Sequence, residues 1–150
     1  MNLNAIHDIY KFNKDAGLLN STYDALLEKS MIVEEALEPL DFTELANVFD
    51  IPGASPKTMA RRIIGLTKPA DVQPVDRLDS AIDQLVLSFG ECFKQGLSVT
   101  ETMNALQIVA TANLTKLSVG TDKQGKQMKP TNFIPPEEQL QVILNNIKGN

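Results

Sequence analysis

The sequence predicts an all-α fold, on the evidence of its hydrophobic periodicity and its composition. Apolar residues recur at three- and four-residue intervals in several segments, while alternation of period two is nearly absent. The 150 residues are 43% hydrophobic and 22% charged, which is ordinary for a soluble globular domain. We therefore expect one four-helix-bundle-like domain over residues 1–150, with a helical insert at about 41–74 and a C-terminal tail at about 118–150.

The first two long helices are expected at about 2–15 and at about 21–40. Gly17 follows the first apolar pattern and is typical of a helix end. Asn20 or Ser21 can cap the second helix, because a short polar side chain accepts hydrogen bonds from the first backbone N–H groups. The second helix carries the first of two acidic clusters.

The insert over 41–74 is expected to hold two short helices. The first covers about 43–49. The second has Ser55 as its cap and Pro56 at its first position, where the missing N–H costs nothing, and it stops at Gly65. The segment is the best candidate for a lid or an interface.

Two further long helices and a short terminal one complete the prediction. The third covers about 75–95, and its apolar stripe predicts the central core helix. Ser98 and Glu101 form a capping box that opens the fourth, which continues to about Leu117. After a polar segment rich in Gly and Pro, a last short helix is expected at about 137–147.

Charge and cysteine content exclude several classes of function. A net charge of -5 argues against a nucleic-acid or membrane surface, since both favour clustered basic charge. The single cysteine, Cys92, rules out an internal disulfide, and one histidine, His7, cannot build a zinc site. No apolar run is long enough to cross a bilayer. We expect a cytoplasmic protein, in the host cytoplasm if its origin is a bacteriophage.

Two acidic clusters are the most informative feature: Glu34, Glu35 and Glu38 on the second helix, and Asp76, Asp79 and Asp83 on the third. Helical projection places Glu34 beside apolar positions, and buried carboxylates need protonation, a basic partner or a cation. Lys or Arg at matching spacing is lacking, so hard divalent cations are the economical partners, magnesium first and manganese second. The alternative is a solvated acidic face.

The fourth helix and the tail supply candidate ligands for an anion. Asn113 lies within an apolar stripe, and Lys116 lies at its edge. Lys126 and Lys129 belong to the one locally basic segment of the chain, where they can neutralise phosphate oxygens. The alternatives are a core asparagine bonded to backbone carbonyls and a solvated lysine-bearing loop.

Three motifs occur in order along most of the chain. They are Glu34-Glu35-x-x-Glu38; Asp79-Ser-Ala-Ile-Asp83 followed by Gly90 and Gly96; and Asn113-Leu-Thr-Lys116-Leu followed by Asp122, Gly125-Lys126, Lys129-Pro130 and Pro135-Pro136. This set resembles the all-α nucleoside triphosphate pyrophosphohydrolases, the MazG-like group related to phosphoribosyl-ATP pyrophosphohydrolase. One departure is Ser80, which stands where the second motif commonly has Glu.

The resemblance implies hydrolysis of a nucleoside triphosphate between its α- and β-phosphates, giving a monophosphate and pyrophosphate. It implies magnesium ligands at Glu35, Glu38, Asp79 and Asp83, with Glu34 as the base or an outer ligand. It also implies that the substrate contacts Asn113, Lys116, Lys126 and Lys129. With this reaction we expect a homodimer or homotetramer, because the stripe of the third helix is poorly covered in a monomer.

Two other functions fit the same residues. In the first, Ser80 marks a decayed site in a protein of the same fold that binds nucleotides without hydrolysing them. In the second, the protein is a helical structural adaptor whose acidic residues are simply solvated. Turnover that requires magnesium would distinguish the enzyme from the nucleotide-binding protein. The structural adaptor predicts that magnesium does not change the melting temperature.

Overall fold

The computed structural model describes residues 3–20, 23–123 and 126–148, and over these ranges the chain is helical. The elements are α1 (Asn4–Asp15), η1 (Leu18–Asn20), α2 (Ala25–Leu37), α3 (Thr43–Val48), α4 (Pro56–Ile64), α5 (Pro74–Lys94), α6 (Val99–Leu114), η2 (Thr115–Ser118) and α7 (Glu137–Lys148). No β-strand occurs in the described part, only an isolated antiparallel bridge between Thr121 and Gln127. The all-α class is confirmed. None of the described helices has the length and apolar character that crossing a bilayer requires.

Most helix ends lie within two residues of their predicted positions, because local capping chemistry fixes them. Ser55 accepts a hydrogen bond from the Thr58 N–H, with Pro56 at the first helical position, and Ser98 and Glu101 form the predicted capping box. The exceptions are the predicted bounds of α2 and the predicted end of the fourth helix near Leu117: α6 ends at Leu114, and the 3-10 helix η2 follows over Thr115–Ser118.

Helix α2 begins and ends inside its predicted limits. Its cap is Asp24, whose carboxylate accepts from the N–H groups of Leu26 and Leu27 at 3.0 Å each. Asn20 instead ends η1, and Ser21, the other predicted cap, lies outside the described residues. The helix ends at Leu37 rather than near residue 40.

The chain divides into two compact units. Unit 1 comprises Met1–Ser21 and Pro74–Asn150, and unit 2 comprises Thr22–Gln73. Two compact units can form one domain or two, so the expectation of a single domain stays a prediction. Each unit is described by itself below.

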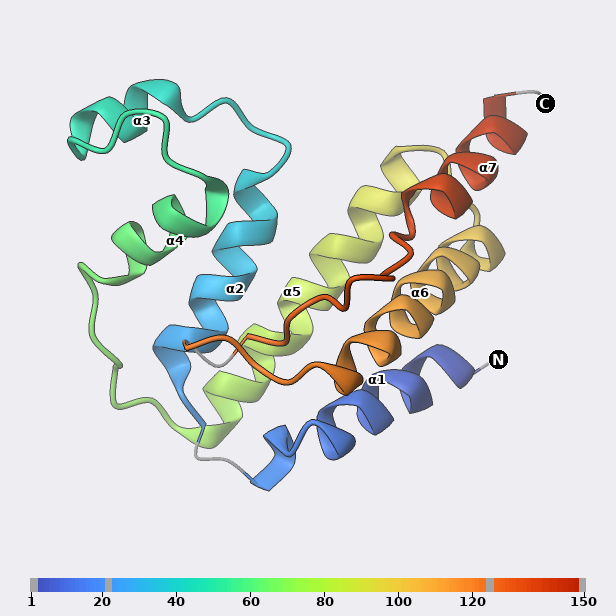
Figure 1. The fold of residues 1–150 in the computed structure, drawn as a ribbon, viewed down its shortest axis with the longest axis horizontal. Helices are drawn as coiled ribbons and strands as arrows, with labels where there is room; N and C mark the ends of the chain where they lie inside the picture. Colours follow the sequence, from blue (N-terminus) through green and yellow to red (C-terminus); the bar gives the residue numbers. More distant parts are fainter. Residues whose placement is uncertain (1–2, 21–22, 124–125, 149–150) are drawn as a thin grey trace. The chain divides into compact units, whose positions relative to one another are not determined.

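In unit 1, α1 packs along α6, as Figure 1 shows. Ala5 and Ala110, both buried, let the two helices approach closely. Between the same helices, Gln107 donates a hydrogen bond to the Asp8 carboxylate. At the other end of α6, helix α7 closes an apolar cavity of about 150 Å³, which is lined by Cys92 and Leu144 among others. Cys92 is half-buried there, in a hydrophobic setting.

Helix α5 differs from the core helix that its stripe predicts, because none of its residues is buried. The apolar residues Val75, Leu78, Ile82, Leu85 and Val86 are 50–69% exposed. The periodicity identified the helix correctly, since periodicity follows from the backbone repeat. It does not say what covers the apolar face.

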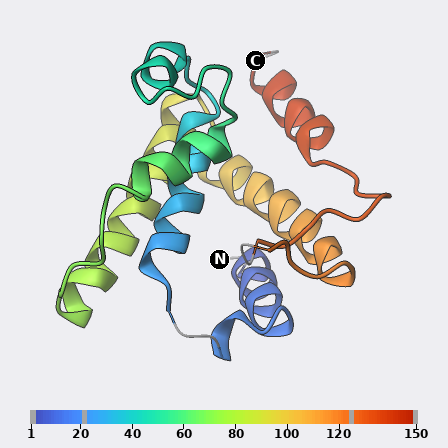
Figure 2. The ribbon, with the colours of Figure 1, turned by 60° about the vertical axis from the view of Figure 1, so that its left-hand side comes forward.

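Unit 2 contains α2, α3 and α4, with α4 packed against α2 (Figure 2). Its core consists of Leu37, Ala46, Met59 and Ala60, and Met59 is fully buried. Partly buried aromatic and aliphatic side chains surround this cluster, Phe42 and Phe49 among them. The core adjoins the acidic end of α2, because Leu37 is both a core residue and the last residue of that helix, and Glu38 follows it.

Candidate functional site

The glutamates of the first acidic cluster gather at the C-terminal end of α2. Glu34 and Glu35 lie in the last turn, and Glu38 occupies the C-cap position. Glu34 is half-buried, whereas Glu35 and Glu38 are exposed. The half-buried position of Glu34 agrees in part with the projection, which placed Glu34 beside apolar residues. Glu38, the C-cap residue, is exposed to solvent.

This position is electrostatically unfavourable for carboxylates. The C-terminal end of a helix carries about half a negative charge, so each acid placed there costs roughly 0.3–1 kcal/mol. The last turn of α2 itself contains no basic residue. A bound cation would offset both the dipole and the mutual repulsion of the three glutamates. Asp76, in the first turn of α5, shows the placement that the dipole favours.

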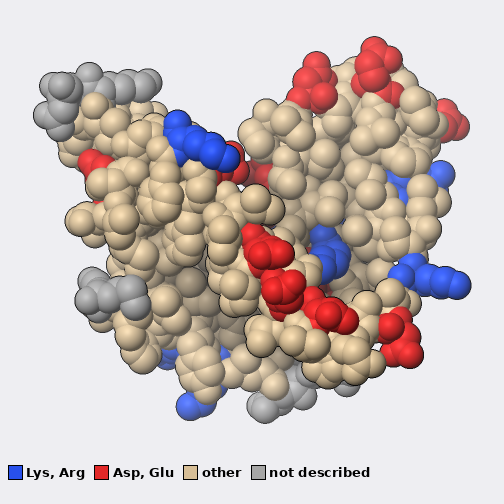
Figure 3. All heavy atoms as spheres, turned by 180° about the vertical axis from the view of Figure 1, so that it is seen from behind, with Lys and Arg blue, Asp and Glu red and all other residues tan. Residues whose placement is uncertain are grey.

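The second cluster lies in unit 1, on α5. Asp79 and Asp83 are one helical turn apart and exposed, and acidic side chains are visible at the surface in Figure 3. Ser80 makes no equivalent contribution: its carbonyl oxygen and its Oγ both accept from the Gln84 amide, at 2.9 and 3.3 Å. The serine that replaces the expected glutamate is thus engaged along its own helix.

Carboxylate oxygen is the donor that magnesium prefers, so the chemistry of both clusters fits that ion. Among the described residues, no three His, Cys, Asp or Glu side chains are gathered in a way that could hold a metal. The two clusters belong to different units, which are described separately. Joint binding of an ion by both clusters stays a prediction.

The predicted anion ligands fare differently, because unit 1 brings three of the four together. The Lys116 ammonium donates to the Asn113 side-chain oxygen at 2.5 Å. The same ammonium lies 5.4 Å from the centre of the Phe133 ring, and the Lys129 ammonium lies 5.2 Å from it. Asn113, expected as a buried amide, is half-buried with Lys116 as its partner.

A short hairpin returns the chain to α6 and so builds this cluster. The Met128 N–H donates to the Gly120 carbonyl at 2.9 Å, and the Asp122 N–H donates to the Lys126 carbonyl at 2.8 Å. Gly120 has a φ of +88°, a conformation that favours glycine. Asp122 also accepts from the Lys126 N–H, which fixes the backbone of the fourth predicted ligand. Gly125, part of the tail motif, lies outside the described residues.

Phe133 is the residue that the sequence analysis missed. The signal in the sequence was an aromatic residue shortly after Lys129-Pro130. In the structure, the Phe133 N–H donates to the Pro130 carbonyl at 3.0 Å, which forms a turn. Spacing alone could not pair this ring with Lys116, because the pairing depends on the hairpin between them.

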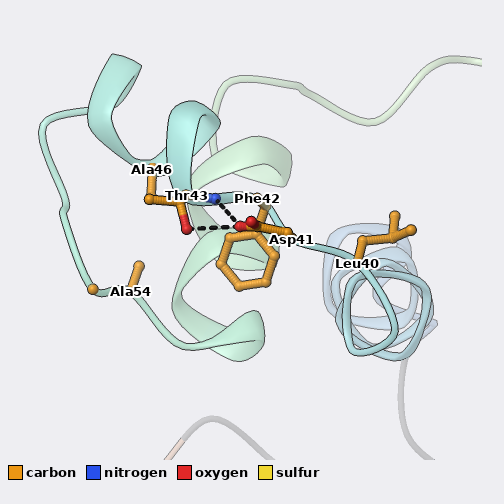
Figure 4. A pocket seen from close by; sticks show the side chains of 7 residues that line it. Leu40, Asp41, Phe42, Thr43, Ala46 and Ala54 are labelled. Atoms are coloured by element: carbon orange, nitrogen blue, oxygen red, sulfur yellow. Dashed lines mark hydrogen bonds between the residues drawn. The ribbon is translucent and has the colours of Figure 1, made fainter.

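Unit 2 has a separate cavity of about 220 Å³ at the start of α3, shown in Figure 4. Its polar feature is Asp41, which accepts from the Thr43 hydroxyl at 2.7 Å and from the Thr43 N–H at 3.0 Å. These bonds lower the pKa of Asp41, the hydroxyl bond most. The carboxylate thus bonds to Thr43, the first residue of α3. Arg62, in the same unit, stacks over Phe49 at 5.8 Å from the ring centre.

Comparisons of the chain with protein-family models, with curated proteins and with solved structures found no match.

Proposed function

We propose that the protein is a magnesium-dependent nucleoside triphosphate pyrophosphohydrolase of the all-α, MazG-like type. The observation that carries the proposal is the run of glutamates at the C-terminal end of α2, where Glu34, Glu35 and Glu38 follow one another within about one helical turn. Such an arrangement offers several carboxylate oxygens in one place, and these are the ligands that hard divalent cations prefer. It is favourable once a divalent cation is bound.

The proposed magnesium ligands of unit 2 are Glu35 and Glu38 on α2. In unit 1, the resemblance assigns the same role to Asp79 and Asp83 on α5, and each pair is proposed by itself. Bound magnesium would neutralise phosphate charge and polarise the phosphorus–oxygen bonds. Glu34, half-buried beside these ligands on α2, would accept a proton from the attacking water. The water oxygen forms a new bond to phosphorus as the α–β anhydride bond breaks, and a nucleoside monophosphate and pyrophosphate leave.

Binding of the triphosphate is assigned to the basic residues of unit 1. Lys116 and Lys129 already lie around one ring, and Asn113 holds the Lys116 ammonium. Lys126 follows on the hairpin. Their positive charge would hold the phosphates, and Asn113 would contact phosphate or sugar.

The test is pyrophosphate release from a panel of standard and modified nucleoside triphosphates, with magnesium, with manganese and with a chelator. We expect release that requires a divalent cation and yields equal amounts of nucleoside monophosphate and pyrophosphate. Release of orthophosphate instead would assign a different reaction. No release with either metal would contradict the proposal.

A second candidate is a nucleotide-binding protein without turnover, and the bonding of Ser80 to Gln84 favours it. At this position the related motif has a carboxylate, and a serine held along its own helix cannot bind magnesium as a carboxylate does. The Ser80→Glu variant separates the two candidates. Nucleotide binding without turnover in the natural chain, followed by turnover in the variant, would identify the second.

A further inference from the structure

Phe133 occupies the one place in unit 1 where two ammonium groups meet a single aromatic ring, among the described residues. Lys116 comes from η2 and Lys129 from the segment after the hairpin, and their nitrogens lie 5.4 and 5.2 Å from the ring centre. Phe133 is half-buried. The ring is held by its turn to Pro130, where the Phe133 N–H donates at 3.0 Å.

The Lys116 and Lys129 ammonium groups share one aromatic ring as a contact. The face of an aromatic ring carries partial negative charge and attracts a cation within about 6 Å. Both lysines satisfy that distance, so one ring stabilises both. The Asn113 oxygen also accepts from Lys116, which fixes the direction of its ammonium. The two cations are thus set in place before any ligand binds.

Resting on the function proposed above, we infer that Phe133 is a positioning residue that holds Lys116 and Lys129 as a paired site for polyphosphate. Two fixed ammonium groups complement an anion that spreads its charge over linked phosphates. An orthophosphate or a monophosphate has only one phosphoryl group to offer. The pair therefore favours triphosphate over monophosphate, which retains the substrate and lets the nucleotide product leave.

The experiment measures the affinity of inorganic triphosphate and of orthophosphate by calorimetry, with a chelator present so that no metal contributes. We expect the natural chain to bind triphosphate at least about tenfold more tightly than orthophosphate. Lys129→Gln should weaken triphosphate binding about tenfold, as loss of a charge-assisted hydrogen bond does. Lys123→Gln is the matched control, because it removes the same charge from an exposed position in the same segment.

Phe133 is tested by two variants. Phe133→Leu keeps apolar bulk but removes the ring, and it should weaken triphosphate binding about threefold to tenfold while leaving orthophosphate nearly unchanged. Phe133→Tyr keeps the ring and should restore both the affinity and the preference. Circular dichroism and the melting temperature verify that each variant is folded.

Two results would overturn the inference: equal affinities for Phe133→Leu and the natural chain, or an equal loss in Lys123→Gln and Lys129→Gln. The outcome is separable from that of the proposed function. Triphosphate binding that depends on Phe133, without any pyrophosphate release, would contradict the proposed enzyme activity and support the polyphosphate site. If Phe133→Leu changes neither pyrophosphate release nor triphosphate affinity, the enzyme activity is supported and the polyphosphate site is contradicted.

Discussion

At the scale of single residues, the most telling side chains are the glutamates that end α2. Glu38 is exposed at the C-cap, where the dipole of the helix and the neighbouring acids both disfavour its charge. A side chain that costs stability in the free protein is best explained by what it binds. The proposed magnesium site therefore predicts opposite effects of one substitution on the stability of the metal-free protein and on its response to magnesium.

The substitution Glu38→Gln should leave the metal-free protein as stable or slightly more stable, because it removes a charge that the dipole disfavours. It should also abolish magnesium-dependent pyrophosphate release and most of the rise in melting temperature that magnesium causes. Melting curves with and without magnesium, together with the release assay, measure these effects.

Glu28→Gln is the matched control for that substitution. Glu28 is also exposed on α2, but it lies in the first turn, where the dipole favours an acid. This variant should lose a few tenths of a kcal/mol of stability and keep its response to magnesium. An unchanged magnesium response in Glu38→Gln would remove Glu38 from the metal site.

At this scale the sequence predicted three residues that unit 1 does bring together, Asn113, Lys116 and Lys129, but it did not predict the Phe133 ring beside the two lysines. Asn113 and Lys116 are three positions apart on one helical lattice, so their contact follows from helix geometry. Lys129 and Phe133 reach the same place only through a hairpin that depends on Gly120 and on Asp122. Contacts that close through a loop of that kind cannot be read from spacing.

At the scale of elements, helix ends carry chemistry that titrates. Glu101 closes the capping box of α6 by accepting from the Ser98 N–H at 2.7 Å, and the hydrogen bonds to Ser98 lower the pKa of Glu101 below its ordinary 4.5. A lowered pKa in the folded state contributes stability above the ordinary pKa. That contribution is lost as the pH falls through the lowered value.

The variant Glu101→Gln should therefore differ most from the natural chain at neutral pH and approach it in acid. Melting temperatures of both proteins between pH 7 and about pH 3 test this expectation. Ser98→Ala, which removes the hydroxyl that binds the Glu101 N–H at 3.2 Å, should reduce the same pH dependence. A constant gap between the natural chain and Glu101→Gln at every pH would show that the carboxylate charge does not act through the cap.

Packing between elements is tested at the core of unit 2. Met59 of α4 is fully buried against α2 and α3, so Met59→Ala should cost about 2–5 kcal/mol in the free energy of unfolding, including the cavity that it leaves. Met128→Ala is the control, because Met128 is 40% exposed and should change stability by no more than about 0.5 kcal/mol. Urea unfolding measures both. Equal, small effects would mean that the core does not rest on Met59.

Element boundaries were predictable wherever one residue alone could serve as the cap. Ser55 and Ser98 had no nearby competitor, and both predictions are confirmed. The start of α2 was misplaced because Asn20, Ser21 and Asp24 all have side chains that cap helices. Local chemistry does not choose among them, and the structure assigns the cap to Asp24.

At the scale of the whole molecule, the most notable surface is the exposed apolar face of α5. Leu78 is 63% exposed, and other members of the same stripe are at least half exposed. Exposed apolar stripes of this length on a helix mark surfaces that associate. We propose that a second copy of the chain covers this face, as in a homodimer or a pair of dimers.

The substitution Leu78→Glu places a charge in the stripe and should convert the dimer to a monomer at micromolar concentration, which light scattering after gel filtration would measure. Leu87→Glu is the matched control, because Leu87 lies on the same helix and is 71% exposed, yet it falls outside the stripe by about a third of a turn or more. A charge there should leave the dimer intact, since the side chain faces away from the apolar surface. A natural chain that is already monomeric would contradict the proposal. If Leu78→Glu and Leu87→Glu both dissociate the dimer, the interface is not confined to the apolar stripe of α5.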